Sequence, residues 1–142
     1  MKLRYIFAIG IPLFAILTGL SFYFYWQDNH QVLAQVETQQ TQAAIEFAKN
    51  NDQMACLSQV IQQSENCREA NCTVGLKVFL SHCIQHAAKS DDLCDGVPEL
   101  HDYLAKVSWS VSVCRKAKVR NGNCSNIVNE IPQLCAATST SL

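Results

Sequence analysis

Equal cysteine intervals place the tightest limit on how this chain can fold. Cys56 and Cys67 are eleven residues apart, and so are Cys72 and Cys83. Eleven residues make about three helical turns, so each pair is expected on one face of its helix. Because only residues 68–71 separate the pairs, the two helices should pack antiparallel as an α-hairpin. The facing cysteines then predict the disulfides Cys56–Cys83 and Cys67–Cys72.

Apolar residues share the faces that carry these cysteines. Over about 28 residues the arrangement resembles the twin C-x9-C hairpins of coiled-coil-helix-coiled-coil-helix mitochondrial proteins, although the intervals here are C-x10-C and an apolar N-terminal run precedes them. The resemblance is geometric and implies no function. The apolar residues expected along the seam are Leu57, Val60 and Ile61 on the first helix, and Leu76, Phe79, Leu80 and Ala87 on the second.

The other four cysteines predict a second, less regular α-hairpin. Pro98 suits the first turn of its first helix, and Asn121-Gly122-Asn123 should end that helix and turn the chain. Pro132 predicts a bend or restart in the last helix. Cys114–Cys124 would close the turn and Cys94–Cys135 would join the far ends, the second pair being less certain because eight cysteines permit many pairings. The expected apolar stripes are Leu100, Leu104, Val107, Val111 and Cys114, then Cys124, Ile127, Val128, Ile131 and Cys135.

The number and spacing of the cysteines also indicate their chemistry. All eight lie between Cys56 and Cys135. An even number in a small exported domain is typical of a disulfide framework. The chain has no C-x-x-C, the spacing typical of zinc ribbons, redox exchange and haem attachment. We therefore expect four structural disulfides in an oxidising compartment.

The N-terminal run predicts a membrane helix. Tyr5 to Trp26 contains no charged residue, and 22 residues of helix cross roughly the ~30 Å core of a bilayer. We expect an uncleaved signal-anchor rather than a cleaved signal peptide, because the apolar run is long and ends in bulky aromatics. Lys2 and Arg4 precede it and the next basic residue is Lys49, so the N-terminus should be cytoplasmic.

The expected fold is all-α, with the lipid bilayer as partner of the N-terminal helix. Asp52 should cap the first helix of the cysteine-rich domain. That domain is expected to be a small disulfide-stapled bundle of about four helices in two α-hairpins. The expected segments are a cytoplasmic N-terminus (1–4), a transmembrane helix (5–26), a helical stalk (27–52), the cysteine-rich domain (53–137) and a flexible tail (138–142).

Residues that could carry chemistry are few. His82 and His86 have the i, i+4 spacing of metal ligands, but no third ligand is indicated. They are weak candidates, and we expect no metal and no cofactor. His101 lies next to Asp102 without a serine or free cysteine placed as a nucleophile. The sequence therefore predicts a protein that is not an enzyme and has no small-molecule substrate.

Partner-binding candidates lie on the predicted helix before Asn121. Trp109 falls opposite the Leu104 stripe, and Val113 follows one turn later, so Trp109 is either a second core contact, which we favour, or an anchor for a partner. Nine basic and twelve acidic residues follow the apolar run, a net charge of −3, so nucleic acid is not expected. Four basic residues cluster near the predicted end of this helix. The cluster is either an ordinary helix C-terminus or a surface that binds anions. Its members are Arg115, Lys116, Lys118 and Arg120.

These expectations favour a non-enzymatic interaction module. Its domain would face the periplasm from a bacterial inner membrane, or the outside or a lumen in a eukaryote. It would serve as an accessory subunit of an envelope complex or as an immunity-type inhibitor. The alternative is metal or redox handling through His82, His86 and any free thiol.

Overall fold

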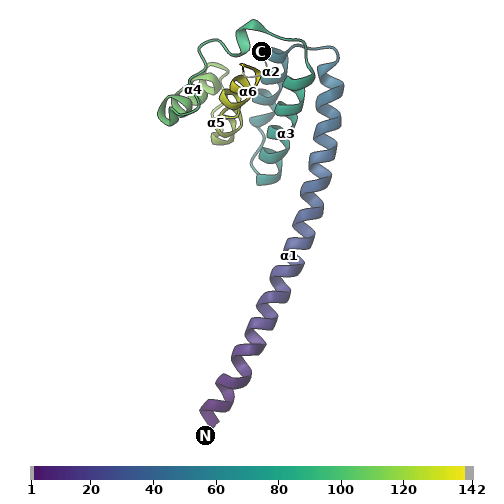
Figure 1. Ribbon diagram of the computed structural model, residues 1–142, viewed down its shortest axis with the longest axis vertical. Coiled ribbons are helices and arrows are strands. Elements are labelled where there is room, and N and C mark those ends of the chain that lie inside the picture. The colour runs from purple at the N-terminus through teal and green to yellow at the C-terminus, as the bar shows by residue number, and fades with distance from the viewer. Residues whose placement is uncertain (1, 140–142) are drawn as a thin grey trace. The chain divides into compact units, whose positions relative to one another are not determined.

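The protein is entirely helical in the part that the structure describes. The computed structural model describes the backbone of residues 2–139 and the side chains of residues 9–137. Within that range there is no strand, only an isolated bridge between Asp52 and Ala88. The all-α prediction is confirmed. In order, the helices are α1 (Lys2–Ala48), α2 (Gln53–Ser64), α3 (Ala70–His86), the short 3-10 helix η1 (Asp91–Leu93), α4 (Tyr103–Lys116), α5 (Gly122–Val128) and α6 (Ile131–Ser139) (Figure 1).

Helix α1 is 47 residues long and contains Pro12. By length and composition it is the single described helix that could cross a membrane. Its large apolar side chains from Ile9 to Trp26 are exposed, as a lipid-facing segment requires. The chain divides within α1 into two compact units, 1–35 and 36–142. Residues 36–48, which the sequence assigned to the stalk, therefore belong to the unit that contains the cysteines.

The end of α1 packs closely against α3. Ala44 and Ala48 are buried, and the rings of Phe47 and Phe79 lie 5.8 Å apart between centroids. Gly75 of α3 allows the approach, because a Cβ there would lie only 3.0 Å from Cγ1 of Val36. Gly75 thus fits the close α1–α3 contact, where any side chain would require Val36 and Gln40 to shift.

Helices α2 and α3 form the first predicted hairpin. Asp52 caps α2 as expected, its Oδ1 accepting a hydrogen bond from the Ala55 N–H at 2.7 Å. Val60 and Leu80 are fully buried between the helices. Helix α2 is shorter than the cysteine spacing predicted, because it ends at Ser64 and leaves Cys67 in the connection.

Gln53 links the N-terminus of α2 to the last turn of α3 and to the segment that follows α3. Its side chain is 8% exposed, and its Nε2 donates to the Ile84 carbonyl at 2.9 Å. Its Oε1 accepts from the Ser90 N–H at 3.1 Å. A buried amide satisfied on both sides stabilises the hairpin end, since an unpaired polar group there would be costly.

The second hairpin differs from the prediction at its helix ends. Helix α4 begins at Tyr103 rather than near Pro98, because Asp102 is the cap and its Oδ1 accepts from the Ala105 N–H at 2.9 Å. The restart that Pro132 predicted is found slightly earlier, between α5 and α6. The cysteine-rich region after Asp52 therefore has five α-helices instead of about four. Helix α6 extends to Ser139, into the expected tail, while residues 1 and 140–142 lie outside the described range.

The predicted buried stripe of α4 is correct at Cys114 but wrong at Leu100 and Leu104. Leu104 is 79% exposed and Val107 is 38% exposed, whereas Ser110 and Cys114 are buried. Ser110 can be buried because its hydroxyl donates to the Val107 carbonyl at 3.0 Å, which leaves no unpaired donor. Cys114 on this side is bonded to Cys124 of α5, and Trp109 and Val113 also pack against the core, whereas Leu104 turns outward. Leu100, also predicted as core, is 45% exposed.

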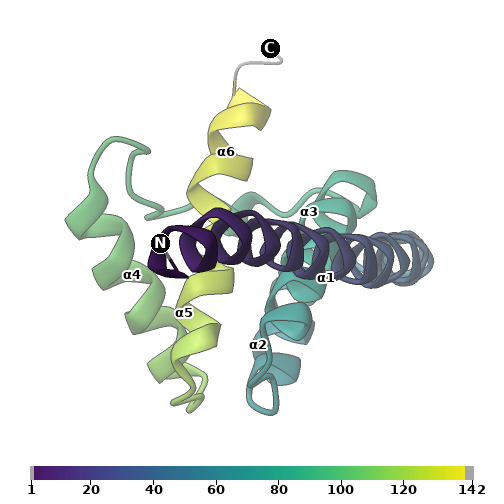
Figure 2. The ribbon, with the colours of Figure 1, turned by 90° about the horizontal axis from the view of Figure 1, so that it is seen from below.

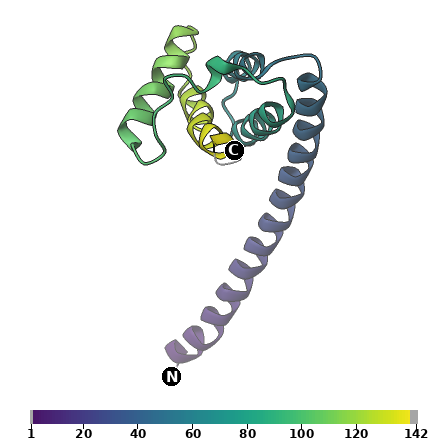
Figure 3. The ribbon, with the colours of Figure 1, turned by 45° about the horizontal axis from the view of Figure 1, so that its top comes forward.

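Helix α5, which belongs to the second hairpin, packs that hairpin against the first. It packs against α4 on one side and against α2 and α3 on the other (Figure 2, Figure 3). Ile127 and Val128 of α5 and Ile131 of α6 are fully buried, as the second apolar stripe predicted. The core is consequently continuous across both hairpins.

Candidate interaction surfaces

All eight cysteines are paired, in the four combinations that the sequence analysis expects. The Cα–Cα distances lie between 5.6 and 6.1 Å, within the normal range for disulfides. No free thiol remains. Of the residues that the metal or redox alternative named, His82 and His86 remain, without an unpaired thiol. The bridges are Cys56–Cys83, Cys67–Cys72, Cys94–Cys135 and Cys114–Cys124.

The histidines offer no assembled site. His86 Nδ1 donates to the His82 carbonyl at 2.9 Å, so this ring is engaged within its own helix. Among the described side chains, no group of three or more ligating residues could hold a metal ion. His101 Nε2 lies 3.1 Å from Glu99 Oε2, and both side chains are mostly exposed. His101 and Glu99 thus form a solvent-exposed contact.

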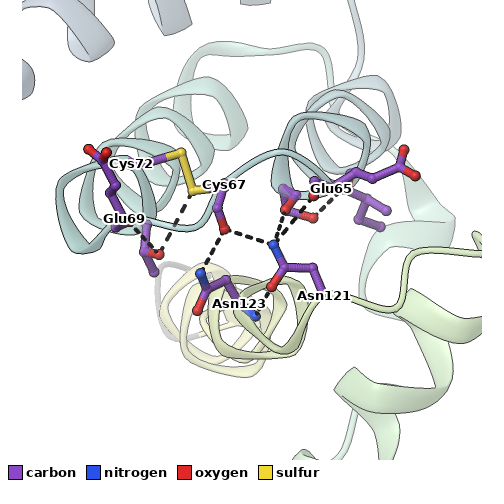
Figure 4. Close-up of a disulfide and its surroundings, with 9 residues drawn as sticks. Glu65, Cys67, Glu69, Cys72, Asn121 and Asn123 are labelled. Carbon is purple, nitrogen blue, oxygen red and sulfur yellow. Dashed lines mark hydrogen bonds between the residues drawn. A yellow bond between two sulfur atoms is a disulfide. The ribbon is translucent and has the colours of Figure 1, made fainter.

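Two asparagines join the turn of the second hairpin to that of the first. Figure 4 shows Asn121 and Asn123 directed at the main chain beside the Cys67–Cys72 disulfide. Asn121 Nδ2 donates to the Ser64 carbonyl at 2.9 Å and to the Cys67 carbonyl at 2.7 Å. Asn123 Nδ2 also donates to the Cys67 carbonyl, at 2.7 Å. The Ser64 carbonyl also accepts from the Cys67 N–H at 3.1 Å, so Asn121 adds a second bond at the end of α2, while both asparagines bind the Cys67 carbonyl in the connection after it.

The sequence predicted a turn at residues 121–123 but not this contact between hairpins. Asn121 is the N-cap of α5, its Oδ1 accepting from the Asn123 N–H at 3.1 Å. A cap preference was readable in the sequence, but the carbonyl partners come from residues more than fifty positions earlier. Only the tertiary structure could identify them.

Helix α4 ends at Lys116, before the predicted stop at Asn121-Gly122-Asn123. Lys118 has a φ of 64°, in the left-handed region. Its N–H donates to the Arg115 carbonyl at 2.9 Å, and the Val119 N–H donates to the Cys114 carbonyl at 3.0 Å. This pattern is a Schellman motif in which a lysine occupies the position that glycine prefers.

We expect Lys118→Gly to stabilise the protein by about 0.5–1 kcal/mol, because glycine adopts this backbone conformation without the steric cost of a Cβ. Thermal unfolding of the full chain in neutral detergent would measure the change. Arg120→Gly is the matched control, since Arg120 lacks a positive φ, and it should destabilise slightly. A lower melting temperature for Lys118→Gly would contradict the prediction.

The predicted partner-binding residues separate into two groups. Trp109 and Val113 are partly buried and pack against the core, which is the role the sequence favoured for Trp109. The four basic candidates are exposed. Arg115 and Lys116 lie in the last turn of α4, and Lys118 and Arg120 lie in the connection to α5.

An open apolar face lies at the start of α4, and it is a better candidate for a partner anchor than Trp109. Tyr103 is 67% exposed and Leu104 is 79% exposed, with Val107 one turn further along α4. Leu100, just before the helix, is also exposed. The sequence analysis missed this surface because Leu100, Leu104 and Val107 were assigned to the core.

No protein-family model, curated protein or solved structure matches this chain. A functional interpretation therefore depends on the sequence and the geometry of the chain itself.

Proposed function

We propose that this protein is a non-enzymatic interaction module that α1 holds at a membrane and that presents the open face of α4 to a protein partner. The observation that carries the proposal is the exposure of Leu100, Tyr103, Leu104 and Val107 beside a disulfide-linked core. Positions 103, 104 and 107 share one face of the helix. Grouped exposed apolar and aromatic residues are typical of interaction sites.

The scaffold favours binding through this face. Cys114–Cys124 links α4 to α5, and α5 packs against the first hairpin. A face held in place before binding loses little conformational entropy on association. A small apolar face on such a scaffold suits a helix or a shallow groove of another protein.

We place the domain in the periplasm of a bacterial inner-membrane protein. Basic residues before the apolar run and their absence until Lys49 support a cytoplasmic N-terminus. Four disulfides support an oxidising compartment on the other side. Within the envelope, the partner would be a subunit of a larger complex or a toxin that the module neutralises.

Site-specific photocrosslinking in intact cells tests the proposal. A crosslinking residue at Leu104 or Val107 should give one adduct of the same mass, whereas the exposed Ser58 on α2 should not give it. Leu104→Glu in a chain that carries the crosslinker at Val107 should abolish the adduct without lowering the melting temperature, because the side chain is exposed. Absence of an adduct from both face positions, or the same adduct from Ser58, would refute the proposal.

A further inference from the structure

We infer that the connection between α4 and α5 forms a binding site for phosphate groups. An open hollow of about 930 Å³ lies there, and its lining includes Arg115, Lys118 and Arg120. A second hollow shares Lys118 and Arg120 and is also lined by Arg68, from the connection between α2 and α3. The two hollows share Lys118, Arg120, Asn121 and Gly122, so basic residues from both hairpins line adjoining concave surfaces, which we call the corner. The inference does not depend on the apolar face of α4.

The charge of this corner is opposite to that of the exported region. Residues after the apolar run carry a net charge of −3, yet the two hollows are lined by four basic residues and one acid, Glu65. Among the described side chains, none of these four cations is in an ion pair. Positive charge in a concave surface concentrates the field and attracts anions.

The corner is assembled before any ligand arrives. Cys114–Cys124 and Cys67–Cys72 fix the two connections that carry the basic residues. Asn121 binds the main chain of the other connection through Ser64 and Cys67. A lysine in the left-handed position at 118, where glycine is favoured, is explained if its ammonium group is needed.

The residue types favour phosphate. Arginine presents parallel N–H groups that match two phosphate oxygens, and lysine adds a point charge. A surface lined by four cations suits a group that carries two negative charges better than a single carboxylate. The phosphate could belong to a soluble compound or to a phospholipid headgroup, and the chemistry of recognition is the same.

Calorimetric titration of the full chain in neutral-detergent micelles with inorganic pyrophosphate, at constant ionic strength, tests the inference. Arg120→Gln and Lys118→Gly should each weaken binding about tenfold, the effect of one charge-assisted hydrogen bond. Lys89→Gln removes an equal charge from an exposed position elsewhere and should leave affinity unchanged. Because Lys118→Gly is expected to stabilise the fold, its loss of binding cannot be attributed to unfolding.

Absence of binding to the wild-type chain, or equal weakening by Lys89→Gln, would overturn the inference. Repeating the titration in nanodiscs identifies the source of the phosphate. Competition by phosphatidylglycerol, relative to phosphatidylcholine alone, would support the site and assign it to lipid headgroups. Unchanged pyrophosphate affinity would support the site and assign it to soluble phosphate compounds.

Discussion

Reducing the four disulfides is expected to unfold the cysteine-rich domain at temperatures where the oxidised protein is stable. A domain of this size has a small core and gains roughly 2–4 kcal/mol from each native bridge. Circular dichroism of the full chain in neutral detergent, with and without reductant, would show this as a large fall in melting temperature. An unchanged melting curve would contradict the expectation.

The bridges should also differ in their contributions. Loop-closure entropy grows with the separation of the paired cysteines, which is 41 residues for Cys94–Cys135 and 5 for Cys67–Cys72. Replacing both cysteines by alanine should therefore cost about 4 kcal/mol for the first pair and about 2 kcal/mol for the second. Chemical denaturation of the two variants measures the difference. A larger loss from the Cys67–Cys72 replacement would contradict the entropic explanation.

Ile127→Ala is expected to destabilise the protein by roughly 2–5 kcal/mol, because the side chain is fully buried. Its helix, α5, packs against α2, α3 and α4. Leu104→Ala is the matched control. Leu104 is 79% exposed, and the change should stay within about 0.5 kcal/mol. Denaturant titrations of both variants provide the comparison. A large loss for Leu104→Ala would restore the buried stripe that the sequence predicted and would refute the open face of α4.

Local signals predicted most of the first hairpin. The cap at Asp52 and the buried Leu76, Phe79 and Leu80 follow from residue type and helical period alone. The short interval between Cys67 and Cys72 leaves few ways to connect the two helices. The restart before α6 was also predictable, because proline cannot continue a helical hydrogen-bond ladder.

Longer-range features could not be predicted in the same way. Apolarity alone assigned Leu104 to the core, whereas packing favoured the face with Ser110, whose hydroxyl is satisfied within its own helix. The role of Asn121 depends on carbonyls in another hairpin. Arg68 and Arg120 line the same hollow, although 52 positions separate them in the chain. Only tertiary packing brings them to one surface.

The bridge between Cys94 and Cys135 has a consequence for biogenesis. Cys135 is the last cysteine to be synthesised, 41 residues after its partner. At typical translation speeds, roughly 2–8 s therefore separate the synthesis of Cys94 from that of Cys135. Cys114 and Cys124 are synthesised within this interval. Throughout this interval Cys94 lacks its partner, and between Cys114 and Cys124 a second thiol is also unpaired, so a stalled chain can form a wrong bridge within itself or with a neighbouring chain. Correct maturation is thus favoured by an isomerase that keeps Cys94 free or reshuffles a wrong disulfide of Cys94.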